Sequence, residues 1–175
     1  MPPLRLLNSA SRLRRNDGRE LPQLHQTDSM STLQITTDKD RLDIGLVHCF
    51  LSTEAYWSRG IPRATVERAI AGSLCFGGYL DGRQVAFARV VTDSATFGYL
   101  ADVFVLPEHR GQGHAKALVA AVMAHPQLQG LRRFSLATSD AHGLYAGFGF
   151  VAPVRPQSLM EKLDPDVYTR TTGTP

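Results

Sequence analysis

One strand-to-helix junction limits what this chain can fold into more than any other feature. In residues 103–126, "VFVLPEHRGQGHAKALVAAVMAHP", an apolar run ends at a proline and a charged turn with two glycines comes next. Apolar residues then recur at i, i+3, i+4, i+7 and i+8, which predicts a helix from Gly111 to about His125 that Pro126 ends. Glycine is favoured where a backbone must turn tightly or let a ligand come close, because it has no Cβ.

The glycine turn fits one of three phosphate-binding templates. A P-loop needs Ser or Thr after its lysine, and Lys116 has neither; a dinucleotide fingerprint needs Gly or Ala where Lys116 stands. The pattern R/Q-x-x-G-x-G/A is matched by Arg110, Gly113 and Ala115. Small residues admit a diphosphate, and the free amides of a helix N-terminus attract it. A plain glycine turn that opens a core helix is the alternative on these residues alone.

The rest of the chain predicts an α/β fold, with a mixed and mostly antiparallel sheet flanked by helices. A "DG" dipeptide at 81–82 joins two of the strands as a hairpin. Expected strands are 32–36, 74–80, 83–92, 96–106, 132–138 and 158–164; expected helices are 40–51 with Asp40 as the cap, 63–73, 111–125 and 140–149.

Composition indicates an ordinary globular protein of 175 residues, with 43% hydrophobic and 20% charged residues. No apolar run is long enough for a membrane span, so no membrane association is expected. Cys49 and Cys75 have no ligand spacing, so we expect buried free thiols in a cytoplasmic protein and no metal. Away from residues 1–29 the charge is nearly balanced, which argues against a nucleic-acid partner.

Residues 1–29 differ in character from the rest of the chain. They hold five arginines against three acids and show no steady period. We expect a disordered extension, or a start set too early with Met30 as the natural one; a targeting peptide and a nucleic-acid tail are the alternatives. Residues 30–175 are expected to form a single domain.

Two motifs together give the chain a family resemblance. "VFVLPEHRGQGHA" and "LATSDAHGLYAGFGFV", about 30 residues apart, resemble the central strand with its pyrophosphate loop and the second signature of the GNAT superfamily of acetyl-CoA-dependent N-acetyltransferases. The resemblance runs from about Leu33 to Met160, and the order of elements agrees. Ala115 stands where Gly is common, and Gly147 where Lys is frequent.

The resemblance implies how acetyl-CoA would be held and used. Direct attack by an amine in a ternary complex is implied, with no metal. The turn from Arg110 through Gly111, Gln112, Gly113 and His114 to Ala115 would hold the diphosphate. The pantetheine arm would pair with Val103, Phe104 and Val105, where the central strand splays from the next one. Tyr145 stands at the position of the general acid that protonates the leaving thiolate.

The amine must also lose a proton. Asp102, an acid inside an apolar strand, is the candidate base, directly or through water; alternatively it faces solvent or pairs with an arginine such as Arg89. His142, Glu54 and ordered water are other candidates.

The acceptor is expected to be a small-molecule amine, selected by the first helices and their loop. Expected acceptor-site residues are Glu54, Tyr56, Trp57 and Arg89. A protein N-terminus or lysine, and a non-catalytic acetyl-CoA-binding regulatory module, are the alternatives. A homodimer is a possible assembly in this superfamily.

Overall fold

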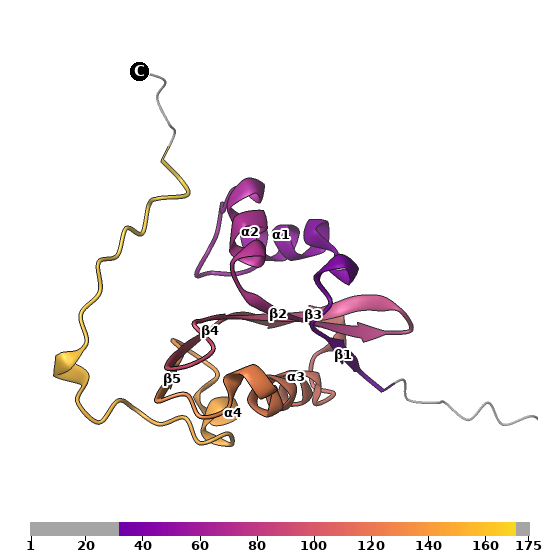
Figure 1. Ribbon diagram of the computed structural model, residues 1–175. Coiled ribbons are helices and arrows are strands. Elements are labelled where there is room, and N and C mark those ends of the chain that lie inside the picture. Colours follow the sequence, from indigo (N-terminus) through magenta and orange to yellow (C-terminus); the bar gives the residue numbers. More distant parts are fainter. Residues whose placement is uncertain (1–31, 171–175) are drawn as a thin grey trace, which may run out of the picture. The chain divides into compact units, whose positions relative to one another are not determined.

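The fold is built on a five-stranded sheet in the order β1-β2-β3-β4-β5 (Figure 1). The structure is a computed structural model and describes residues 32–170, so the predicted extension at 1–29 lies outside the described residues. The strands are β1 Gln34–Thr36, β2 Leu74–Leu80, β3 Arg83–Thr92, β4 Phe97–Val105 and β5 Arg133–Ser135. Neighbouring strands are antiparallel except β4 and β5, which run parallel, so the predicted mixed sheet is confirmed.

Helices cover both faces of this sheet. The helices are α1 Ile44–Thr53, α2 Arg63–Ala71, α3 His114–Ala124 and α4 His142–Ala146. Figure 1 shows α1 and α2 on one face, and α3 and α4 on the other. The alternation of side chains along the strands supplies both cores: Phe87 and Phe104 pack toward α1 and α2, whereas Ala86 and Val105 pack toward α3. None of the helices described is long and apolar enough to span a bilayer.

Local signals placed the hairpin correctly. Asp81 and Gly82 both have positive φ, 48° and 78°, as a two-residue turn of the predicted kind requires. Both cysteines are free, as expected, but only Cys75 is buried; Cys49 is exposed. Burial raises the pKa of the Cys75 thiol to about 11, so this thiol stays neutral.

The predicted helix starts were partly wrong. Asp40 lies in a short 3-10 helix, Lys39–Arg41, and the cap of α1 is Asp43, whose carboxylate accepts from the Leu46 amide at 2.9 Å. Leu42 between them is extended, so a continuous helix from Asp40 cannot form. Helix α3 begins at His114 rather than Gly111, because Gly113 has a φ of 83°, outside the helical region.

The predicted strand at 158–164 is wrong. This part of the chain holds only a 3-10 helix at Pro156–Ser158, and Leu159, Met160 and Leu163 are exposed. The alternation in "SLMEKLD" is a local pattern, whereas a strand also needs a neighbouring edge to bond with. The nearest edge strand, β5, is only three residues long where seven were expected.

Candidate active site

A bulge in β4 creates the opening in which the candidate site lies. Phe87 of β3 faces Phe104, but Arg89 faces Ala101, so β4 carries one extra residue between these pairs. Asp102 lies in this bulge with a φ of 53°, a left-handed conformation that is uncommon outside glycine. β5 pairs only with Phe97–Tyr99, so no described strand lies beside residues 100–105 on that edge.

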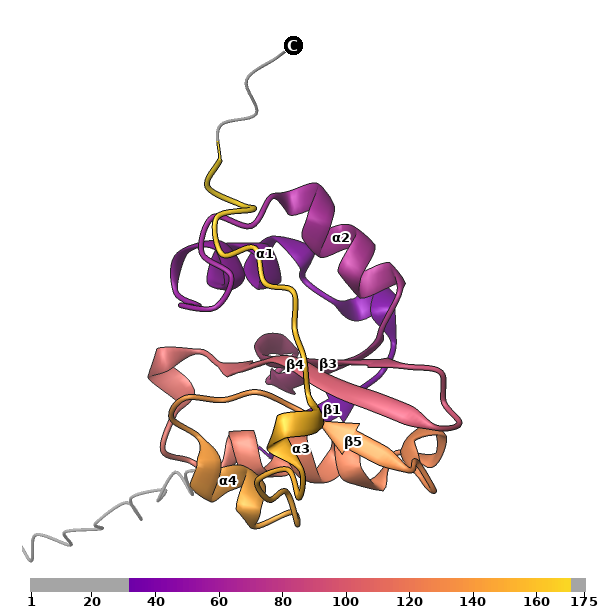
Figure 2. The ribbon, with the colours of Figure 1, turned by 90° about the vertical axis from the view of Figure 1, so that its left-hand side faces the viewer.

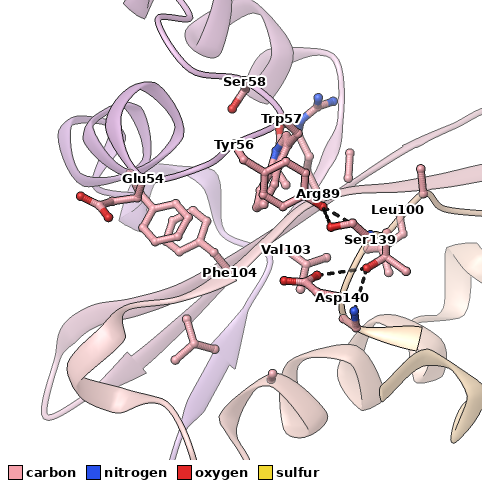
Figure 3. Close-up of a pocket in the computed structure, with 18 of the residues that line it drawn as sticks. Glu54, Tyr56, Trp57, Ser58, Arg89, Leu100, Val103, Phe104, Ser139 and Asp140 are labelled. Atoms are coloured by element: carbon pink, nitrogen blue, oxygen red, sulfur yellow. Dashed lines mark hydrogen bonds and ion pairs between the residues drawn. The ribbon is translucent and has the colours of Figure 1, made fainter. Parts of the chain in front are cut away.

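A cleft of about 950 Å³ fills this opening. One wall is β4, another is the loop after α1 with Tyr56 and Trp57, and a third is the 137–141 loop before α4 (Figure 3). Of the predicted site residues, the cleft is lined by Glu54, Tyr56, Trp57, Arg89, Asp102, Val103, Phe104, Val105, Arg110, Ala115 and Tyr145. These residues come from distant parts of the sequence, and the fold brings them together.

The glycine turn has the geometry of an anion cradle. Gly111 and Gly113 have φ values of 75° and 83°, and a Cβ added at either would meet nothing within 4 Å. Within the described residues, no amide from 111 to 116 donates a hydrogen bond; the first bond of α3 runs from Ala117 to Gly113. Several amide N–H groups at one helix N-terminus are therefore available to a diphosphate.

Two side chains of the turn add to this fit. Arg110 donates from Nε to the Val105 carbonyl at 3.0 Å, which fixes its guanidinium between the turn and the open edge of β4. The Nε2 atom of His114 is buried without a hydrogen-bond partner among residues 32–170. A buried polar atom without a partner is costly, so this position is one where the folded chain carries an unmet hydrogen-bonding group.

Tyr145 is the strongest candidate for an acid. It lies in α4, is only 8% exposed, and packs edge-on against Phe150 with ring centroids 6.0 Å apart. Burial raises the pKa of its phenol above the ordinary value, and the nearby Asp140 and Tyr56 raise it further. The phenol therefore keeps its proton at neutral pH while its ring lines the cleft.

Asp102 holds two partners at the bulge. Its Oδ2 pairs with Arg89 Nε at 2.5 Å and its Oδ1 accepts from the Trp57 indole at 3.1 Å. Arg89 also donates to the Ser73 hydroxyl at 3.2 Å. The structure thus shows the pairing with Arg89 that the sequence left open, and the base role of Asp102 stays a prediction.

A second link crosses the cleft above the bulge. The Ser139 hydroxyl donates to the Tyr56 hydroxyl at 2.5 Å, and Tyr56 meets Trp57 edge to face with centroids 5.0 Å apart. Ser139 was not predicted as a site residue, since only a fold can pair residues 83 positions apart. Tyr168, also missed, lines the same cleft from the C-terminal segment.

Two alternative candidates for the base lie in different surroundings. Glu54 comes directly after α1 and lines the cleft, with its side chain exposed. His142 lines another groove, between β5 and residues 150–159. Among the residues described, no three His, Cys, Asp or Glu side chains gather closely enough to hold a metal ion.

Comparison with known proteins identifies the family. The model of the acetyltransferase (GNAT) family matches residues 44–150, which include the first signature motif and all but the last residue of the second. The chain belongs to the GNAT acetyltransferase family. It is therefore an acyltransferase, and the predicted superfamily and fold class are confirmed; GNAT enzymes use acetyl-CoA and act on an acceptor.

Individual GNAT relatives agree with this assignment. A Gibberella zeae protein named "Putative acetyltransferase" is 32% identical over 63% of this chain and 74% of its own length. A crystal structure of a GNAT-family protein from Xanthomonas campestris is 64% identical, covers 81% of this chain and 99% of that one, and has a TM-score of 0.78. A protein from Clostridium acetobutylicum described as a predicted acetyltransferase, solved with acetyl-CoA, shares the fold at 16% identity, with 77% of this chain and 96% of that one covered and a TM-score of 0.56.

Proposed function

We propose that this GNAT enzyme transfers an acetyl group from acetyl-CoA to a primary amine of a small molecule, by direct attack in a ternary complex. The observation that carries the proposal is one cleft that joins an anion cradle, an unpaired strand edge and a buried, protonated phenol. These are the three parts that acetyl transfer from a phosphate-bearing thioester needs.

Cofactor binding would use the turn and the strand edge. The amides of residues 111–116 and the guanidinium of Arg110 would hold the diphosphate. The open edge at Val103–Val105 offers backbone groups to an amide-rich arm, which would lie beside β4 as a strand does. Acetyl-CoA supplies the activated acetyl group, with no metal.

Tyr145 would complete the exchange of bonds. As the C–N bond forms and the C–S bond breaks, the departing sulfur carries negative charge. A phenol that keeps its proton at neutral pH can give it to that sulfur. Tyr145 would regain a proton from solvent, and the amine's proton would pass through the base to solvent, so no net proton is gained or lost by the enzyme.

Asp102 is our candidate to receive the amine's proton. Each of its oxygens already accepts one hydrogen bond, from Trp57 and from Arg89, and each has capacity for another. A water bound there could pass the proton from the amine to the carboxylate. The bulge would then have a purpose, because it turns an acid on an apolar strand into the cleft.

The test is a panel of small amines with acetyl-CoA. Thiol release is followed with DTNB, and the acetylated product is identified by mass spectrometry. We expect amine-dependent thiol release for at least one small amine. If acetyl-CoA binds but no amine on the panel releases thiol, the protein is a binding module or modifies a macromolecule, and the proposal is wrong.

A further inference from the structure

The C-terminal segment reaches back to the candidate site. Figure 2 shows it crossing in front of the sheet toward the side of α1 and α2, and Figure 1 shows that most of it stands away from the sheet. Residues 164–170 end it in a turn, in which the Asp166 carbonyl accepts from the amides of Thr169 and Arg170 at 3.1 and 3.0 Å. Arg170 and Asp164 form an ion pair that closes the turn.

Tyr168 is the residue through which this turn meets the cleft. It is half-buried against the core cluster of α1 and α2, and it lines the cleft together with Ile61. Its carbonyl lies 3.5 Å from the position that a Cβ on Gly60 would take, so the turn sits directly on the loop between α1 and α2. The acceptor end of the cleft therefore has a wall supplied from the far end of the chain.

Aromatic rings dominate this end of the cleft. Phe50 and Phe104 are stacked with centroids 3.9 Å apart, and Tyr168 packs on the same cluster. Tyr56 and Trp57 remain 57% and 44% exposed although hydrogen bonds hold both. Fixed rings with uncovered faces suit a ligand that has an apolar body.

The charges in the cleft disfavour an anionic acceptor. Among the described residues that line it, the only cations are Arg89 and Arg110. Arg89 is paired with Asp102 and Ser73, and Arg110 lies at the glycine turn. Glu54 and Asp140 line the cleft without an ion pair to any described residue. A carboxylate or phosphate on the acceptor would meet these unpaired acids, and both described cations are already committed.

We infer that the acceptor is a primary amine with an apolar, ring-sized body and no acidic group, and that Tyr168 packs on that body and sets this preference. The inference rests on the proposed function, because it describes the acceptor of the same reaction.

Matched amines test the acceptor chemistry. Phenethylamine and phenylalanine share a ring and a primary amine, and differ by one carboxylate. We expect kcat/KM to be at least about 10-fold higher for phenethylamine, as one unfavourable charge contact predicts. The kcat/KM for phenethylamine should also exceed the kcat/KM for ethylamine, which lacks the ring. A higher kcat/KM for phenylalanine or for glucosamine 6-phosphate than for phenethylamine would overturn the inference. Acetyl transfer to small amines would still stand.

Tyr168→Ala tests the wall. We expect KM for phenethylamine to rise about 10-fold, with KM for ethylamine and for acetyl-CoA unchanged, and Tyr168→Phe to restore the ring preference. Val154→Ala is the control, because Val154 lies in the same segment, is 93% exposed and does not line the cleft. Equal changes for both amines would show a merely structural role and overturn the assignment. If the wild type releases no thiol with any amine, although acetyl-CoA raises its Tm, the proposed function fails first and this inference with it.

Discussion

At the scale of single residues, Tyr145 is both buried and in contact with the cleft. Burial keeps its phenol protonated by making the anion unfavourable, yet its ring still borders a cleft that admits ligand. An exposed tyrosine would keep its proton at neutral pH as well. In the proposed reaction, burial would add a low dielectric around the sulfur that receives the proton, in which a hydrogen bond is stronger.

Tyr145→Phe should therefore lower kcat by about 100-fold, the usual size of acid catalysis, while KM for acetyl-CoA stays unchanged. The ring is kept, so its packing on Phe150 and the Tm should persist. Because the pKa is raised from its ordinary value of 10.0, the wild-type rate should fall with rising pH only above about pH 10, and the variant should lack that fall. A kcat within about twofold of wild type would remove Tyr145 from the mechanism.

Asp102→Asn tests whether Asp102 accepts a proton or only pairs with its neighbours at the bulge. Asparagine tolerates the left-handed backbone and can still accept from Trp57, but it leaves the Arg89 guanidinium without its counter-charge. We expect the free energy of unfolding to fall by about 1–3 kcal/mol, with a lower Tm. We also expect kcat to be at least about 10-fold lower.

The double variant Asp102→Asn with Arg89→Met decides between the two roles. Removing both charges should recover stability, because no guanidinium is left unpaired. If Asp102 accepts the amine's proton, kcat should stay low in the double variant. Recovery of kcat together with Tm would show that the loss in Asp102→Asn came from the unpaired Arg89 guanidinium, and that Asp102 is not the base.

At the scale of elements, the glycine turn before α3 offers a matched pair of substitutions. Gly113 and Gly130 both have positive φ, 83° and 72°, and neither has an atom within 4 Å of an added Cβ. Alanine at either position therefore meets no clash and carries only a conformational penalty of about 1–2 kcal/mol. Gly113→Ala should raise the Kd for acetyl-CoA about 10-fold, because binding must restore the strained turn. Gly130→Ala should leave the Kd for acetyl-CoA unchanged. An equal rise in Kd for both variants would show that the turn at Gly113 does not bind the diphosphate.

The turn between β3 and β4 predicts a pH dependence of stability. The Asp93 carboxylate accepts from the amides of Ala95, Thr96 and Phe97 and from the Thr96 hydroxyl, so its pKa lies well below the usual range. The pKa is lowered in the folded state, so its stabilisation is present above about pH 4 and is lost as pH falls below that. Asp93→Asn should lower Tm at pH 7 and flatten the fall in Tm as pH drops below about pH 4. An unchanged profile would contradict this.

How much the sequence could predict depends on the range of each interaction. The glycine turn and the "DG" hairpin depend on neighbouring residues. The hairpin was placed correctly, and both glycines of the turn have positive φ, although α3 begins three residues later than predicted. Asp102 could be picked out because an acid in an apolar strand is unusual, but its partners Trp57 and Arg89 come from other elements. The 158–164 strand failed because nothing local states whether a neighbouring edge exists. Tyr168 had no local signal at all.

At the scale of the whole molecule, three parts of the fold line the cleft. One side is β4 and the glycine turn, another is the 137–141 loop with α4, and the third is the α1–α2 loop with the C-terminal turn. β4 and β5 share only three paired residues each, and the Tyr56–Ser139 hydrogen bond is a polar link across the opening. A ligand in this cleft would add contacts to several of these parts at once.

Acetyl-CoA should for this reason stabilise the whole fold rather than one loop. At about a hundredfold excess over Kd, a ligand that binds only the folded state adds about 2.7 kcal/mol, which corresponds to a Tm increase of about 5–10 °C for a domain of this size. Thermal denaturation followed by circular dichroism should show this shift as a single transition. Gly113→Ala should need about 10 times more acetyl-CoA for the same shift, since its turn must be restored on binding. Gly130→Ala starts from a lower Tm but should respond as the wild type does. A wild type whose Tm does not move with acetyl-CoA would overturn the assignment of this cleft as the cofactor site, however well its residues match the family.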